Sequence, residues 1–152
     1  MAQRQFRFGV VHSDPPGSLV WADRVREVEN LGYDTLLMTD HIDGQYAMGP
    51  AMGAAAMVSA RLHCGSLVYC NDFYNPVLLA REAASLDHIS GGRFLLGIGA
   101  GWDARDYART GVAFDSAGVR IDRLAESIEI IRACFTDRKS TRLNSSHPYR
   151  SR

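Results

Sequence analysis

Short segments that are apolar throughout alternate four times with segments of helical periodicity between residues 6 and 135. The apolar segments are rich in β-branched and aromatic residues, which is typical of buried strands, and they occupy residues 6–11, 33–39, 62–70 and 93–98. The segments 18–32, 50–61 and 76–90, and the segment after Gly118, predict helices. Apolar strands that alternate with helices predict a parallel α/β sheet covered by those helices.

The boundaries of these helices can also be predicted. Ser18 is expected to cap the first helix and Gly32 to end it, while Gly91 and Gly92 are expected to end the third. We expect 99–118 to be a loop, in which Asp103, Arg105 and Asp106 are solvated. The last helix has one apolar stripe, with charged side chains expected to face solvent. The stripe consists of Ile121, Leu124, Ile128 and Ile131, and the charged residues are Arg120, Asp122, Arg123, Glu126 and Glu129.

Four strand-helix units fit either an open doubly wound sheet or part of a (β/α)8 barrel, and the pattern does not choose between the two. A complete barrel needs ~250 residues. Residues 1–137 would therefore form the N-terminal half of a (β/α)8 TIM barrel, an α/β domain of four parallel strand-helix units. Both architectures place binding sites at the C-terminal ends of the strands, and candidate residues are best sought there.

The charges are distributed unevenly. All 17 acidic residues but only 12 of the 17 basic residues precede residue 138, so segment 1–137 carries −5 and the last fifteen residues carry +5. An acidic domain argues against nucleic acid as a partner. No signal peptide or membrane span is recognisable, so we expect a cytoplasmic protein with no membrane partner. Cys64, Cys70 and Cys134 lack metal-ligand spacing, and we expect no metal site.

Residues 138–152 differ from the rest of the chain. They read RKSTRLNSSHPYRSR, with the only lysine of the chain, no acidic residue and almost no apolar one. This segment resembles the translation of sequencing-adaptor DNA. A native basic tail is the alternative. In either case the segment cannot pack a core, and we expect a disordered tail.

Two groups of residues follow predicted strands and could carry chemistry. Asp40 and His41 come after the second strand, where an imidazole beside a carboxylate could transfer a proton or hold a cofactor ring. The glycine-rich segment after the fourth strand, Gly97 to Gly101, could let a ligand approach the backbone closely. Its GxGxG spacing differs from the dinucleotide-binding GxGxxG. Trp102 follows it and could stack on a ligand or fill the loop.

The third strand ends with polar and aromatic groups suited to one face of a flat ring. Strand alternation predicts that Ser66 and Val68 lie on one side and Leu67 and Tyr69 on the other. Packing inside a barrel is the alternative role for these side chains.

Taken together, GYDTLLMTDH (32–41), NPVLLAREAASLDHISGGRF (75–94) and LGIGAGW (96–102) resemble the luciferase-like monooxygenase family, also called the bacterial luciferase-like superfamily. The NDF before NP is most similar to the branch that uses the deazaflavin coenzyme F420. The resemblance implies a (β/α)8 barrel that transfers hydride between F420 and a small organic substrate, a reaction that we do not expect this half-barrel to catalyse by itself. The alternatives are an FMN-dependent monooxygenase and a non-catalytic half-barrel. The family often dimerises, which implies a homodimer for the longer parent protein.

The resemblance also implies roles for individual residues. Asp40 and His41 correspond to the catalytic positions near cofactor and substrate. Ser66, Leu67 and Val68 correspond to a third-strand bulge, where many deazaflavin members have a non-proline cis peptide against the ring. The remaining implied cofactor contacts are Gly99, Ala100, Gly101 and Trp102. Deazaflavin sugar-phosphate dehydrogenases have a glutamate where this chain has Trp102, which argues against a sugar-phosphate substrate.

Overall fold

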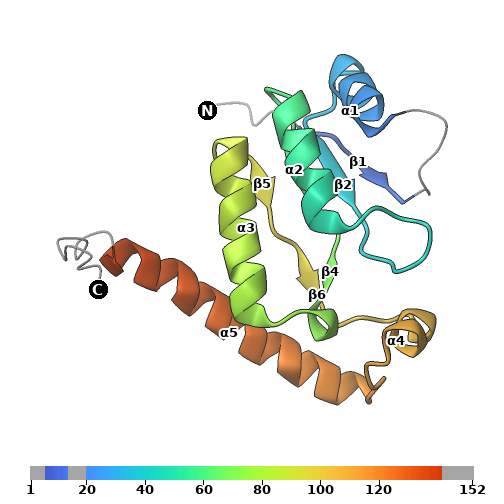
Figure 1. Ribbon diagram of the computed structural model, residues 1–152, viewed down its shortest axis with the longest axis vertical. Helices are drawn as coiled ribbons and strands as arrows, with labels where there is room; N and C mark the ends of the chain where they lie inside the picture. Colours follow the sequence, from blue (N-terminus) through green and yellow to red (C-terminus); the bar gives the residue numbers. More distant parts are fainter. Residues whose placement is uncertain (1–5, 14–19, 142–152) are drawn as a thin grey trace, which may run out of the picture.

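The computed structural model describes residues 6–13 and 20–141 of the chain. Four strands form one parallel sheet in the order β1-β2-β3-β5 (Figure 1): β1 (Gly9–His12), β2 (Thr35–Met38), β3 (His63–Ser66) and β5 (Phe94–Leu95). Two further strands, β4 (Tyr69–Cys70) and β6 (Ile98–Gly99), pair in parallel just after β3 and β5. The third and fourth strands expected from the sequence are therefore each split in two.

The strand order settles the choice between the two architectures. Neighbouring strands follow one another in chain order, without the reversal that defines a doubly wound sheet. Figure 1 shows α1 (Trp21–Asn30), α2 (Met48–Val58) and α3 (Pro76–Ser90) on one side of the sheet. Consecutive parallel strands with helices on one face are the arrangement of a (β/α)8 barrel, so the prediction of its N-terminal half is confirmed.

The register of the strands shows which face of the sheet forms the core. One row of paired residues lies under the helices and belongs to the hydrophobic core: Val10, Leu36, Cys64 and Phe94. The next row lies on the opposite face, where Val11 and Leu95 are exposed: Val11, Leu37, Gly65 and Leu95. Such alternation is the ordinary consequence of the two-residue strand period. The second face is the one that a closed barrel would turn inward.

α3 has a defined start and end, and Arg93 joins its C-terminal end to neighbouring elements. α3 begins at Asn75, whose side chain accepts hydrogen bonds from two backbone amides of the first turn, and it ends at Gly91 with φ of 68°. The guanidinium of Arg93 donates to the carbonyl oxygens of Ala56, Leu62 and Ser90 at 3.0, 2.6 and 2.7 Å. The predicted bounds of α3 are confirmed, and Arg93 joins it to α2 and β3.

The last helix is longer and packs differently than the sequence suggests. α5 (Ala117–Thr141) crosses beneath α3 in Figure 1, and its C-terminal part projects away from the sheet. Ile131 is buried, but Ile121 is exposed, whereas Arg120 is buried and Arg123 half-buried. The expected positions of these three residues on the helix are wrong, because α5 also packs against the 3-10 turn η1 (Asn71–Phe73), where Arg123 meets an acidic partner.

Three further expectations concern segment ends. Residues 99–118 are not all loop, because 104–110 form a short helix, α4 (Ala104–Thr110). Ser18 lies outside the described residues. Of the expected tail, 138–141 continue α5 and 142–152 lie outside the described part of the chain, so the boundary at residue 137 stays a prediction.

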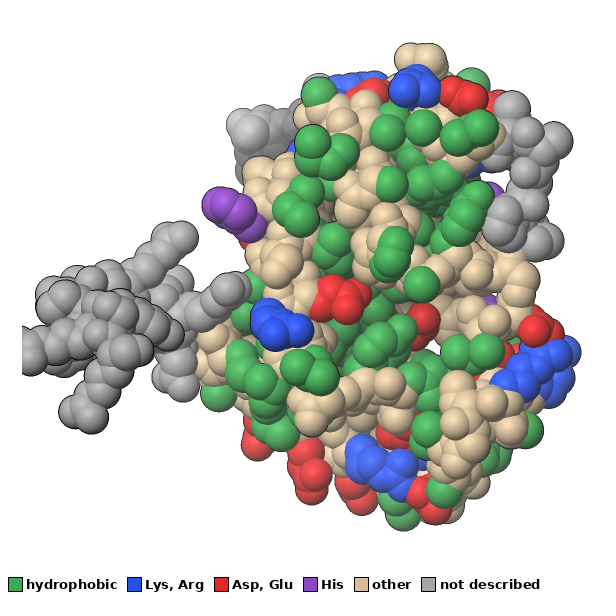
Figure 2. Space-filling view, viewed as in Figure 1, with side chains coloured by type: hydrophobic (Ala, Val, Ile, Leu, Met, Phe, Trp, Pro, Cys, Tyr) green, Lys and Arg blue, Asp and Glu red, His purple; other side chains and the backbone are tan. Residues whose placement is uncertain are grey.

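The outer surface of the helical layer is mixed. Figure 2 shows hydrophobic side chains interspersed with polar ones over the face formed by α2 and α3. The exposed large apolar residues of these two helices include Met57, Val77, Leu78 and Ile89. No helix within residues 6–13 and 20–141 has the length and apolar character needed to cross a bilayer.

Candidate active site

A cavity of about 400 Å³ opens where β2, β4 and β6 end, and α4 closes one side of it. This is the C-terminal end of the parallel strands, where the sequence analysis placed the candidate residues. Most of them line the cavity, together with residues from η1 and α4: Thr39, Asp40, His41, Leu67, Val68, Cys70, Phe73, Gly99, Ala100, Gly101, Trp102, Asp103, Asp106 and Tyr107. Of the residues to which the family resemblance assigns roles, Ser66 does not line it, and Gly97 and Tyr69 also lie outside its lining.

Asp40 joins the end of β2 to β4 and to the segment after η1. One carboxylate oxygen accepts the backbone N–H of Cys70 at 3.0 Å, and the other accepts the hydroxyl of Tyr74 at 2.9 Å. Burial raises the pKa of Asp40, although both hydrogen bonds and nearby His41 oppose that shift. Burial likewise raises the pKa of Tyr74, with Asp40 as the second cause. Asp40 thus lines the cavity while each of its two carboxylate oxygens accepts a hydrogen bond from the protein.

His41 pairs with a residue that the sequence analysis assigned to a solvated loop. Its Nδ1 lies 2.7 Å from Oδ2 of Asp106, and Oδ1 of Asp106 accepts the backbone N–H of Ile42 at 3.3 Å. Asp106 is buried in the first turn of α4. The prediction of a solvated Asp106 is wrong, because the seven-residue α4 folds its first turn against the loop after β2. Asp103 caps the start of this helix and Gly111, with φ of 74°, ends it, but no periodic apolar stripe marks it in the sequence.

Leu67 and Val68 turn toward the cavity between two strands. The peptide bond between them is cis, and both side chains are exposed at the cavity wall. Ser66 and Tyr69 are instead buried, and Ser66 exchanges hydrogen bonds with Gly97 through its hydroxyl. The predicted alternation of these four side chains is wrong, since β3 ends at Ser66 and β4 begins at Tyr69, which interrupts the strand period.

The glycines opposite Val68 are required by the protein's own packing. A Cβ atom at Gly99 would lie 2.6 Å from a methyl group of Val68. At Gly101, φ is 75° and a Cβ atom would lie 2.3 Å from the Tyr107 hydroxyl. Either contact is too close for a side chain, and the second position also has a backbone conformation that favours glycine. The wall formed by these residues is therefore made largely of backbone.

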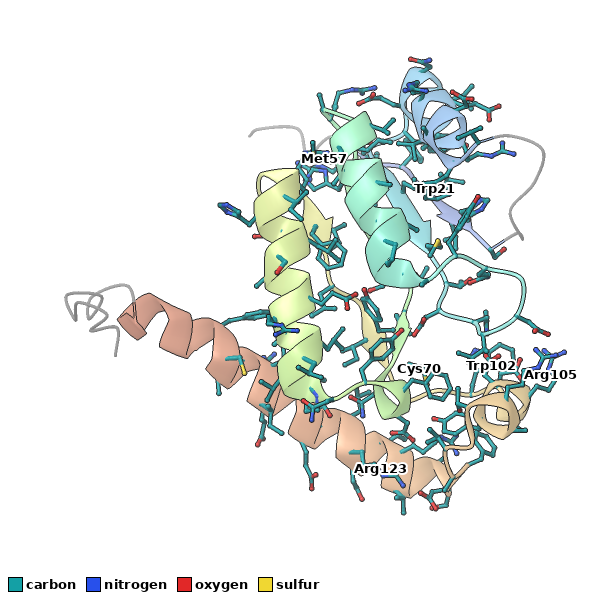
Figure 3. All side chains as sticks on the ribbon, viewed as in Figure 1. Trp21, Met57, Cys70, Trp102, Arg105 and Arg123 are labelled. Atoms are coloured by element: carbon teal, nitrogen blue, oxygen red, sulfur yellow. The ribbon has the colours of Figure 1, made fainter. Side chains whose placement is uncertain are left out.

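Trp102 and Arg105 lie at the α4 end of the molecule, as Figure 3 shows. The edge of Trp102 meets the His41 ring with centroids 5.8 Å apart and an interplanar angle of 88°, while 72% of the residue remains exposed. Arg105 holds both oxygens of Asp103 at distances of 2.6 to 3.2 Å. These hydrogen bonds lower the pKa of Asp103 to about 2, so it stays ionised.

A polar cluster behind the cavity attaches α4 and α5 to η1. The Asp72 side chain is 1% exposed, and its Oδ2 accepts from Arg123 at 2.9 Å and from the Tyr107 hydroxyl at 3.1 Å. Arg123 also pairs with Asp115. Tyr107 stands between Phe73 and Phe114 in tilted ring contacts. The cluster fixes α4, and hence Asp106, relative to the strands.

One group of potential metal ligands lies at the cavity. Single ligand atoms of His41, Asp103 and Asp106 lie within 4.8 Å of one another. The distance of 2.7 Å between His41 and Asp106 is that of a direct hydrogen bond, and Arg105 holds Asp103. The described contacts satisfy these groups with one another, and we assign no ion to them.

The model of the family described as luciferase-like monooxygenase matches residues 14–150. The chain belongs to the luciferase-like monooxygenase family. The cavity therefore lies at the end of the barrel that carries the binding sites of (β/α)8 enzymes.

Individual luciferase-like proteins show the range of relatives. The chain is 31% identical to the 4-hydroxyprotoasukamycin monooxygenase of Streptomyces nodosus subsp. asukaensis over 81% of this chain and 34% of that protein. It is 32% identical to the F420-dependent glucose-6-phosphate dehydrogenase of Amycolatopsis mediterranei over 71% of this chain and 35% of the relative. The chain thus spans about a third of the length of these two curated relatives.

A solved structure has the same fold. The oxygenating constituent of 3,6-diketocamphane monooxygenase from Pseudomonas putida, in complex with FMN, superposes with a TM-score of 0.68 at 21% identity. The match covers 82% of this chain and 38% of that protein. At this identity the similarity establishes the fold, and it agrees with the half-barrel described above.

Proposed function

We propose that the chain is the cofactor-binding part of a luciferase-like oxidoreductase that transfers hydride between the deazaflavin F420 and a small uncharged organic molecule. The observation that carries the proposal is the cavity at the ends of β2, β4 and β6, which brings Asp40 and His41 against Leu67, Val68 and the backbone from Gly99 to Gly101. Relatives named as F420-dependent dehydrogenases support the choice of cofactor.

The residues present suit a ring-shaped cofactor. The cavity volume lies within the ~300 to 1,000 Å³ typical of small-molecule sites. Its walls combine apolar side chains with glycine backbone, and a flat ring can approach such backbone closely. We propose that Leu67, Val68 and Ala100 hold the ring and that Trp102 covers it. F420 would supply the hydride chemistry, and the protein would supply position and polarity.

The polar side chains of the cavity would handle protons. Imidazole is a common general acid and base in enzymes, and His41 lies at the cavity surface, which suits it to give or take a proton at the substrate. Asp40 lines the same wall but binds Cys70 and Tyr74 with its two oxygens. We therefore propose that Asp40 acts mainly by holding the end of β2 against β4.

The charges around the cavity restrict the substrate. Among the described residues, its lining includes three carboxylates, those of Asp40, Asp103 and Asp106, and no lysine or arginine. Arg105 pairs with Asp103, but the carboxylates of Asp40 and Asp106 have no such partner in this lining, and they disfavour a phosphorylated substrate beside His41 because like charges repel. This supports an uncharged substrate, even though some relatives are named as glucose-6-phosphate dehydrogenases.

An FMN-dependent monooxygenase is the second candidate. A monooxygenase among the relatives and the FMN complex among the solved structures favour it, and the same cavity would hold the flavin ring. A half-barrel without catalytic activity is the third reading, since the chain spans a third of these relatives.

Titration of the chain with F420 and with FMN, followed by the fluorescence of each cofactor, tests these alternatives. We expect saturable binding of F420 that exceeds binding of FMN. Preference for FMN would replace the first proposal by the second. Binding of neither would support the non-catalytic half-barrel.

A matched pair of substitutions locates the binding. Leu67 lies at the cavity and is 47% exposed, while Leu78 is 55% exposed on α3 away from it. Leu67→Trp should fill the cavity and weaken F420 binding at least about tenfold, equivalent to roughly 1.4 kcal/mol. Leu78→Trp should bind like the wild type. Equal affinity in both variants would place the cofactor elsewhere on the chain.

A further inference from the structure

The orientation of the His41 ring is determined by contacts on both its backbone and its side chain. The backbone N–H of His41 donates to Oε1 of Gln45 at 3.3 Å. The amide nitrogen of Gln45 in turn donates to the Thr39 hydroxyl at 2.7 Å and to the Ser13 carbonyl at 2.8 Å. Gln45 thus fixes the loop that carries the imidazole.

The contact with Asp106 also decides where the imidazole proton lies. An ionised carboxylate can only accept hydrogen bonds, so a neutral His41 must carry its proton on Nδ1 to make the 2.7 Å contact. The second oxygen of Asp106 accepts from Ile42, which prevents the carboxylate from rotating freely. Nε2 is then the acceptor nitrogen of the neutral ring.

We propose that Asp106 is a positioning residue that holds His41 in the Nδ1–H tautomer, with Nε2 available to accept a proton at the cavity. The inference rests on the proposed function, because it assigns this tautomer to a proton transfer at the site. Asp106 does not itself touch the reacting atoms. A nearby carboxylate also stabilises the imidazolium once Nε2 has accepted the proton.

A structural role for Asp106 is the competing explanation. Asp106 lies in the first turn of α4, where a negative charge stabilises a helix. Its hydrogen bond from Ile42 N–H also attaches α4 to the loop after β2. The chain contains a second ion pair between the same two segments, from Asp43 to Arg109. Asp43 therefore serves as a control that attaches the loop to α4 without contacting the imidazole.

The test is nitrogen NMR of the histidine side chains in the purified chain, at a pH where the imidazoles are neutral. The wild type should show His41 as the Nδ1–H tautomer. In Asp106→Asn the amide oxygen can keep the bond from Ile42 N–H, which leaves the amide nitrogen facing Nδ1. The population of the His41 tautomers should then shift toward the Nε2–H form. Asp43→Asn should keep the wild-type tautomer.

Three results would overturn the inference: an Nε2–H tautomer in the wild type, an unchanged tautomer in Asp106→Asn, or equal shifts in both variants. The indole N–H of Trp21, which donates to the Ala51 carbonyl at 2.8 Å in another part of the molecule, reports whether each variant is folded. If Asp106→Asn does not fold, the wild-type tautomer alone decides. No cofactor enters this measurement, so its failure is distinct from failure to bind F420.

Discussion

Among single residues, the half-buried Asp40 binds two protein donors at the edge of the cavity. Its two oxygens bind the amide of Cys70 and the hydroxyl of Tyr74, yet burial still raises its pKa. A carboxyl whose pKa is higher in the folded than in the unfolded chain binds its proton more tightly when folded. Binding of this proton therefore stabilises the folded chain fully at pH values below the pKa of the unfolded chain. The stabilisation is lost as the pH rises through the pKa of the folded chain.

We therefore predict that Asp40→Asn gains stability relative to the wild type as the pH rises. The amide oxygen can accept from Cys70 N–H, and the amide nitrogen can donate to the Tyr74 hydroxyl, so both contacts survive without a buried charge. The difference in free energy of unfolding, measured by urea denaturation across the acidic to neutral range, should increase with pH. A difference that is constant with pH would contradict the raised pKa.

Tyr74→Phe provides the complementary change. It removes the hydroxyl that donates to Asp40 while leaving the ring against Tyr69, where the centroids are 5.0 Å apart. We expect a loss of roughly 1 to 3 kcal/mol at neutral pH, because a half-buried charged acceptor loses its donor. The loss should be smaller in acid, where Asp40 is protonated.

At the scale of elements, η1, α4 and α5 are joined by the Asp72 carboxylate. Both Arg123 of α5 and Tyr107 of α4 donate to one of its oxygens, and Figure 3 shows Arg123 on the α5 face near α4. Among the described residues, Arg123 is the one that supplies a positive charge to this buried carboxylate. The attachment of α5 to η1 near its N-terminal end should therefore depend on that side chain.

Arg123→Ala should destabilise the chain by about 2 kcal/mol, less than the ~3 to 5 kcal/mol for breaking a fully buried ion pair, because Arg123 is itself 36% exposed. Arg132→Ala, an exposed position on the same helix, should change stability by less than about 0.5 kcal/mol. The free energies come from urea denaturation. Adding Asp72→Asn to Arg123→Ala should recover part of the loss, and a strictly additive double variant would argue against the pair.

The ends of α3 and the position of the cavity can both be predicted from the sequence. The segment 76–90 is predicted with its correct ends because Asn75, Pro76 and Gly91 each have a local conformational preference that marks a helix boundary. The cavity position follows from Asp40 and His41 coming after a strand. Local preferences and strand order are both encoded in short stretches of the chain.

Other features depend on contacts distant in sequence. Asp106 is buried only because α4 packs against a loop 64 residues earlier, and seven residues are too few for a periodic pattern. The outward turn of Leu67 and Val68 likewise depends on how β3 and β5 each give way to a second strand. Neither contact leaves a signal in the neighbouring sequence.

At the scale of the whole molecule, the four-stranded sheet has one covered and one open face. Within the described residues β1 and β5 are its outer strands, and Val11 and Leu95 lie exposed on the face opposite the helices. Unpaired strand edges beside an apolar surface favour pairing with another sheet. The chain should consequently associate with itself as its concentration rises.

Analytical ultracentrifugation of the chain should detect this association. Leu95→Lys should weaken it at least about tenfold, because an ammonium group would have to be buried in the contact. Ile89→Lys replaces a comparably exposed residue at the end of α3 and should leave the association unchanged. Equal behaviour of the two variants, or a monomer at all concentrations, would show that the open face is not the contact.

The glycine wall of the cavity limits how this site can diversify. Gly99 and Gly101 cannot gain a side chain without displacing Val68 or Tyr107, so that wall has a fixed shape. Variation that changes ligand preference must therefore fall on the opposite and outer sides, at Leu67, Trp102 and the residues of α4. Random mutagenesis with selection for a new ligand should accordingly accumulate substitutions at those positions and leave the two glycines unchanged.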